Sequence, residues 1–127
     1  MPVISISLNE KNIQDLDSLQ ELLGLSNRSE AIRLCLRSAE AEIKERMDLS
    51  GEVEGVLIVV HNRHADLWLT NIIHKNEDII KTHMHSHLKD HQCLEVLIVG
   101  GDADELKEML LEIQSKSVAD YVKFVRG

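Results

Sequence analysis

Three alternating histidines followed by a cysteine form the most informative stretch of this sequence. His83, His85 and His87 are separated by single residues, and Cys93 follows His87 after five more. Successive side chains of a β-strand point to opposite faces, so the three imidazoles would share one face of a strand. If the chain turns back through residues 88–92 as a hairpin, His87 lies opposite Cys93. Two imidazoles and a thiolate can then converge on one point.

This donor set predicts a transition-metal site. His74 precedes His85 by ten intervening residues and could complete four ligands, either from the same chain or from a neighbouring one. Imidazole and thiolate together favour nickel, copper, zinc or cobalt. Three ligands on a flat hairpin suit a planar arrangement, which favours Ni(II) or Cu(II), although tetrahedral zinc also takes His and Cys. In the same register His85 faces Glu95, and we expect Glu95 and His83 to hold the ligands in orientation.

Two other interpretations of the cluster are weaker. Alternating histidines can simply be the solvated face of a strand. A Cys93–His87 pair could also act as a nucleophile, but no glycine-rich oxyanion turn or substrate-binding motif accompanies it, so we do not expect an enzyme. The remaining histidines, His61, His64 and His91, are expected at the surface.

The elements that carry this cluster follow one another in the order β-α-β-β-α-β. The predicted strands are 52–60, 80–88, 92–99 and 118–125, and the predicted helices are 65–79 and a second one capped by Asp102 after a chain break at Gly100-Gly101. This order is the split βαβ pattern of ferredoxin-like domains.

The N-terminal segment predicts a strand and two helices. Residues 3–8 alternate between apolar and small polar side chains, as a half-buried strand does. Asn9 is a candidate N-cap, Gly24 a candidate helix end, and Ser26-Asn27 a second helix start. A single strand has no partner here, so we expect a two-fold dimer that pairs two copies into a ribbon, and such a ribbon fits a DNA major groove.

Composition limits the classes of protein that remain. The chain has 127 residues, a net charge of −8 and 2% aromatic residues, so its core must be built from Leu, Ile and Val. No apolar run approaches the roughly 20 residues of a membrane helix, and the N-terminus lacks the features of a signal peptide, so a cytoplasmic protein without membrane association is expected. Cys35 is interpreted as a small core residue. Ser50-Gly51 marks the expected boundary between domains 1–48 and 52–127.

The sequence resembles the nickel-responsive transcriptional regulators of the NikR type, from Val3 to about Ser117. One shared feature is the N-terminal strand leading into two helices. A second is Asn27-Arg28-Ser29-Glu30-Ala31, which many ribbon–helix–helix proteins share. The most specific is His74, ten residues, His85-x-His87, five residues, Cys93-Leu94-Glu95.

The resemblance implies an α+β chain with an N-terminal ribbon–helix–helix followed by a ferredoxin-like, ACT-type domain. It also implies a homotetramer, a dimer of dimers, that binds a double-stranded DNA operator. Each chain would bind one square-planar Ni(2+) through His85, His87 and Cys93, with His74 supplied by a neighbouring chain. Metal would favour DNA binding, usually to repress nickel uptake. Because the ligands come from two chains, assembly would couple the metal site to the DNA-binding site.

The expected DNA contacts lie in the N-terminal arm. Ser5 and Ser7 would face the bases, and Val3 would at most touch a thymine methyl. Phosphates would be contacted by Asn27, Arg28 and Ser29 at a helix start. Val3 and Leu34 stand where family members often carry a basic and an acidic residue, and residues 1–48 carry six basic and nine acidic side chains, a net charge of −3. A metal-binding protein with weak or no DNA recognition, or a sensor of copper or cobalt, therefore stays open as an alternative.

Overall fold

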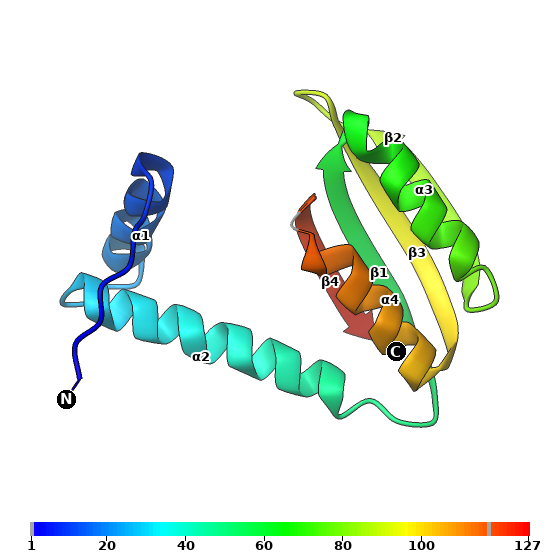
Figure 1. The fold of residues 1–127 in the computed structure, drawn as a ribbon, viewed down its shortest axis with the longest axis horizontal. Coiled ribbons are helices and arrows are strands. Elements are labelled where there is room, and N and C mark those ends of the chain that lie inside the picture. The colour runs from blue at the N-terminus through cyan, green and yellow to red at the C-terminus, as the bar shows by residue number, and fades with distance from the viewer. Residues whose placement is uncertain (1, 117) are drawn as a thin grey trace. The chain divides into compact units, whose positions relative to one another are not determined.

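The computed structural model describes residues 2–116 and 118–127. The chain divides into two compact units, Met1–Glu45 and Arg46–Gly127. Among the described residues no helix is long and apolar enough to cross a membrane. Figure 1 traces the elements along the chain.

The first unit contains the two predicted helices, with local sequence setting their ends. Helix α1 spans Glu10–Leu22 and is capped as predicted, because the Asn9 side chain accepts a hydrogen bond from the backbone of Asn12 at 2.8 Å. Gly24, at φ 65°, adopts the left-handed conformation that ends the helix. Helix α2 spans Arg28–Met47, and Asn27 Oδ1 accepts from the backbone N–H of Glu30 at 2.9 Å.

The apolar residues of this unit are largely uncovered. Residues 2–9 lie outside helices and strands in the single chain, with Val3 93% and Ile4 82% exposed. A strand needs a second strand to satisfy its backbone, so the predicted ribbon depends on a second chain. Cys35 is exposed, and its prediction as a core residue is wrong because no other element of this unit covers that side of α2.

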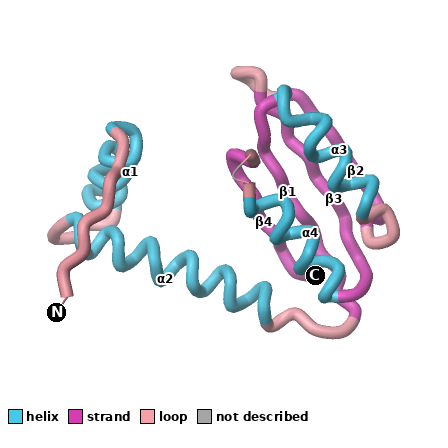
Figure 2. The backbone as a smooth tube through the Cα atoms, viewed as in Figure 1, coloured by secondary structure: helices cyan, strands magenta, loops and turns pink. Residues whose placement is uncertain are grey.

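The second unit is a four-stranded antiparallel sheet with two helices, and it confirms the predicted α+β class with βαββαβ order. Its elements are β1 (Glu52–Asn62), the short helix η1 (Arg63–Ala65), α3 (Asp66–Lys75), β2 (Ile80–His87), β3 (Gln92–Asp102), α4 (Ala103–Ser115) and β4 (Ala119–Arg126). The strand order is β2-β3-β1-β4. Figure 2 shows α3 and α4 on one face of the sheet.

The core lies between that sheet face and the two helices. Alternate residues of β1 and β3, such as Leu57 and Leu97, are fully buried against helix residues such as Leu69 and Met109. Among the described residues of this unit no helix covers the opposite sheet face, and its apolar side chains remain partly or largely exposed, among them Met84, Ile98, Tyr121 and Val125.

Three predicted boundaries in this unit are wrong. Strand β1 extends beyond its predicted end at Val60 to Asn62. The helix predicted over 65–79 ends at Lys75, where the Asn76 side chain donates to the Ile72 carbonyl at 2.8 Å and the chain turns toward β2. Strand β3 continues through Gly100-Gly101, which pair with β1. A Cβ on Gly100 would lie 2.5 Å from the Lys81 side chain, so the glycine leaves room for that side chain.

Candidate metal centre

The β2–β3 hairpin has the register that the sequence predicts. His87 is paired with Cys93, and His85 with Glu95. The turn between the strands places Asp90 and His91 at φ 60° and 59°, a left-handed pair typical of tight hairpin turns. The hairpin alone therefore brings the two imidazoles and the thiol to one end of the sheet.

The cluster lies on the same sheet face as the core. Toward this end of the sheet, the buried apolar residues Val99 and Leu97 of β3 give way to the buried Glu95 and Cys93. In the antiparallel strand β1, the buried Val59 gives way in the same direction to His61. The helix-facing side of the sheet thus changes from apolar to polar toward this end. Buried polar groups are costly without partners, so this change predicts a site.

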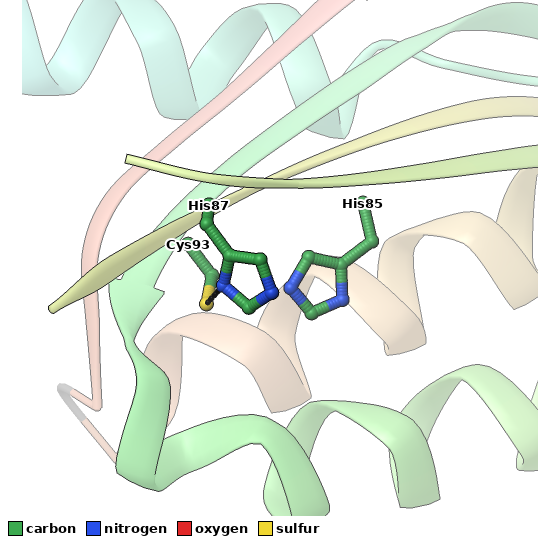
Figure 3. Close-up of side chains that lie close together, drawn as sticks. All are labelled: His85, His87 and Cys93. Atoms are coloured by element: carbon green, nitrogen blue, oxygen red, sulfur yellow. Dashed lines mark hydrogen bonds between the residues drawn. The ribbon is translucent and has the colours of Figure 1, made fainter. Parts of the chain in front are cut away.

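His85, His87 and Cys93 offer ligand atoms that all lie within 4.8 Å of one another. Figure 3 shows the two imidazoles beside the sulfur, and His87 Nδ1 lies 3.7 Å from Cys93 Sγ. Ligands on opposite sides of an ion with bonds of 2.0–2.3 Å are up to about 4.6 Å apart. The three side chains therefore fit one late transition metal with little movement, and the mixed N and S donors suit nickel, copper, zinc or cobalt.

Glu95 is a buried carboxylate at the centre of the histidines. It is 3% exposed, and its oxygens lie 2.7 Å from His61 Nε2, 2.5 Å from His83 Nε2 and 3.4 Å from His85 Nδ1. An imidazole that gives one nitrogen to a carboxylate has its ring fixed and its other nitrogen available. Glu95 thus contacts one candidate ligand, His85, while the orienting role of Glu95 and His83 stays a prediction.

His61 is the histidine whose predicted position at the surface is wrong. It was expected at the surface, but its side chain is fully buried. In β1 it lies opposite Cys93 and continues the alternation of Leu57 and Val59. That alternation was the available signal, and the prediction failed because the strand was expected to stop at Val60. His64 and His91 are exposed, as predicted.

His74 lies apart from this cluster within the chain. It is exposed in the last turn of α3, and it belongs to none of the possible metal-ligating groups among the described residues. A fourth ligand from His74 would therefore come from a neighbouring chain.

The thiol of Cys93 is held in its neutral form. Burial raises its pKa above the ordinary 9.0, and the negative charges of Asp66 and Glu95 raise it further. A metal ligand is the thiolate, so binding an ion would release this proton.

The predicted DNA-contacting residues are all exposed, but the side chains of Asn27 and Arg28 are hydrogen-bonded within the chain. Val3, Ser5, Ser7 and Ser29 face solvent. The Arg28 guanidinium donates two hydrogen bonds to the Asp17 carboxylate, at 2.8 and 3.0 Å, which lowers the pKa of Asp17. The charge of Arg28 is thus paired with that of Asp17 in this conformation.

The fold and site define a ferredoxin-like domain whose sheet carries a His/Cys cluster able to hold a metal ion. Residues 54–126 match the family described as the NikR C-terminal nickel-binding domain. A protein of Methanococcus maripaludis provisionally named a nickel-responsive regulator is 36% identical over 97% of this chain and 89% of its own length. A similarly named protein of Geobacter sulfurreducens is 39% identical over 85% of this chain and 79% of its own length.

The chain therefore belongs to the NikR family, whose members are transcriptional regulators and not enzymes. Among solved structures, an uncharacterized protein of Thermotoga maritima is similar, with a TM-score of 0.54 and 14% identity over 60% of this chain and 98% of that one. At that identity the similarity shows the fold alone.

Proposed function

We propose that this chain is a cytoplasmic, nickel-dependent, DNA-binding transcriptional regulator that represses metal uptake. The observation that carries the proposal is the convergence of His85, His87 and Cys93 within 4.8 Å on a NikR-type domain. Each chain would bind one Ni(2+), and the exposed His74 of a neighbouring chain would supply the fourth ligand.

Two uncovered apolar surfaces support assembly into a homotetramer, a dimer of dimers. The first is the N-terminal segment, where Val3, Ile4 and Ile6 are 57–93% exposed and would be covered if two such segments paired as a ribbon. The second is the helix-free face of the sheet, where Ile98 is 44% exposed. A ligand set divided between chains would make nickel affinity depend on assembly and so couple the metal to DNA binding.

A nickel titration followed by absorption tests the metal site. A nickel–thiolate charge-transfer band and a diamagnetic complex should appear at about one ion per chain, since a planar N/S site favours Ni(II). Cys93→Ala should abolish the band. Cys35→Ala is the matched control and should leave it unchanged, because Cys35 is exposed on α2 in the other unit. A band that persists without Cys93 would contradict the proposal.

DNA binding is tested on fragments near the chain's own gene and near a nickel transporter gene. The proposal expects a shift in electrophoretic mobility that requires nickel, with Ser5 and Ser7 toward the bases and Asn27, Arg28 and Ser29 toward the phosphates. Loss of binding in a Ser5→Ala, Ser7→Ala double variant that still binds nickel would support these contacts.

A metal-binding protein without DNA recognition is the second candidate. The Arg28–Asp17 pair and the net charge of −3 over residues 1–48 favour it, because phosphate neutralisation dominates DNA affinity. The absence of a nickel-dependent shift on every such fragment, with nickel still bound, would select this candidate.

A further inference from the structure

A second group of metal-ligating side chains lies beside the candidate nickel ligands and shares one of them. His61, Asp66 and Cys93 offer ligand atoms within 4.8 Å of one another. His61 comes from β1, Cys93 from β3, and Asp66 begins α3, so all three belong to one unit of one chain. Unlike the set with His74, this set needs no neighbouring chain.

The orientation of the His61 ring would allow its Nε2 atom to bind a metal ion. Its Nδ1 lies 2.7 Å from the Asn62 carbonyl oxygen, to which it can only donate. Nε2 makes a 2.7 Å hydrogen bond with Glu95 Oε2 and lies 3.6 Å from Asp66 Oδ1, so a metal ion at Nε2 would replace the proton of that hydrogen bond. A backbone carbonyl that accepts from Nδ1–H is the contact by which proteins orient the Nε2 of a metal-binding histidine.

The distances leave room for an ion. Ligand atoms of a tetrahedral zinc with bonds of 2.0–2.3 Å are about 3.3–3.7 Å apart. His61 Nε2 and Asp66 Oδ1 are 3.6 Å apart, which is longer than a good hydrogen bond. The Asp66 side chain is 46% exposed while that of His61 is fully buried, so Asp66 provides the entry path from solvent.

The local charge also favours a divalent cation. Asp66 and Glu95 both act on Cys93 electrostatically, and Arg63 is the cation that opposes them there. A bound thiolate would add a third negative charge to these two carboxylates. Three protein ligands would leave the fourth tetrahedral position to water, as in many open zinc sites.

We propose that His61, Asp66 and Cys93 form a second, chain-internal site that binds Zn(II) in tetrahedral geometry. The proposal depends on the proposed nickel function only through the shared Cys93. Zinc in this inner site takes the thiolate from the planar set, so zinc and nickel compete for each chain. Because the inner site uses no neighbouring chain, zinc would occupy it without the contact between chains that nickel requires.

Zinc binding to the full chain tests the proposal, measured by competition with a chelator and with Co(II) as a spectroscopic substitute. Asp66→Asn is preferred to a change at His61, since Asp66 is half exposed and its loss leaves the core intact. Zinc affinity should fall at least about tenfold in Asp66→Asn and stay within about threefold of wild type in His87→Ala. Asp78→Asn removes the same charge from an exposed position and should change neither metal.

The nickel band separates this result from the proposed function. Asp66→Asn should retain the nickel–thiolate band, and zinc added to wild type should bleach it. Zinc affinity that falls in His87→Ala but not in Asp66→Asn would place zinc among the planar ligands and overturn the proposal. An equal fall in both variants, or no zinc binding by wild type, would overturn it as well. If wild type shows no nickel–thiolate band, the proposed nickel function is refuted. Zinc binding by His87→Ala would then still test whether the inner site exists.

Discussion

Replacing Glu95 with Gln isolates the buried carboxylate that holds the histidine cluster. The substitution keeps the shape of the side chain and removes its charge. It also exchanges one acceptor oxygen for an NH₂ group, so one of the two histidines loses its acceptor. We expect both the stability of the metal-free protein and its nickel affinity to fall.

The size of the effect follows from the two hydrogen bonds. The bond from His61 Nε2, at 2.7 Å, is buried at both ends, and a hydrogen bond to a charged group contributes about 1.5–3 kcal/mol. The bond from His83 involves a side chain that is 35% exposed, so it contributes about 0–1 kcal/mol after solvent screening. Losing the buried bond alone therefore predicts a cost of about 1.5–3 kcal/mol, and losing both bonds about 1.5–4 kcal/mol. Either is a large part of a typical stability of about 5–15 kcal/mol.

Urea unfolding of the metal-free protein at fixed chain concentration measures this loss. The midpoint should fall without a change in slope, and the nickel dissociation constant should rise about 10- to 100-fold, as for other groups that orient metal ligands. Glu52→Gln, at an exposed position, is the matched control and should stay within about 0.5 kcal/mol of wild type.

The reasoning is refuted if Glu95→Gln unfolds with the same midpoint as Glu52→Gln and binds nickel as wild type does. A loss of stability with unchanged nickel affinity would refute the orienting role alone. His83→Gln removes only the exposed bond and should cost less than about 1 kcal/mol.

Four further predictions concern the Cys93 thiol, the Arg28–Asp17 pair and the core. Nickel affinity should rise up to about tenfold per pH unit below the raised pKa of Cys93, because binding displaces the thiol proton; a pH-independent affinity by calorimetry would contradict this. The same raised pKa stabilises the metal-free fold at pH values below the ordinary 9.0, and this contribution should be lost as the pH rises through the folded value. Asp17→Asn should free Arg28 and steepen the salt dependence of DNA binding by about one ion, measured by fluorescence anisotropy, whereas Asp15→Asn should change it less. Leu57→Ala, at a fully buried core position, should cost about 2–5 kcal/mol in urea unfolding, while Leu67→Ala, at a 72% exposed position, should cost under about 1 kcal/mol.

Local patterns in the sequence predicted the hairpin and its register well. Strand alternation and a short turn are sufficient to place His87 opposite Cys93 and His85 opposite Glu95. The caps at Asn9 and Asn27 are equally local, because each side chain bonds a backbone N–H three residues away. Such features need no knowledge of distant packing.

Features that depend on distant packing were harder to predict. The burial of His61 depends on β1 extending to Asn62 and pairing with β3, so a single strand pattern ending at Val60 placed it at the surface. Gly100 was predicted to break the chain because the sequence does not show that the Lys81 side chain packs over it. Cys35 was assigned to a core that its own unit does not contain, and the strand over residues 3–8 stays a prediction that requires a second chain.

The central claim is that one nickel ion joins two chains, and mixing subunits tests it most directly. A His74→Ala chain keeps the three clustered ligands, and a Cys93→Ala chain keeps His74, so neither alone should form the nickel–thiolate complex. When the two are unfolded, mixed in equal amounts and refolded, a site shared between chains predicts that about one quarter of the wild-type band returns. No recovered band, in mixed oligomers shown to contain both chains, would contradict the account.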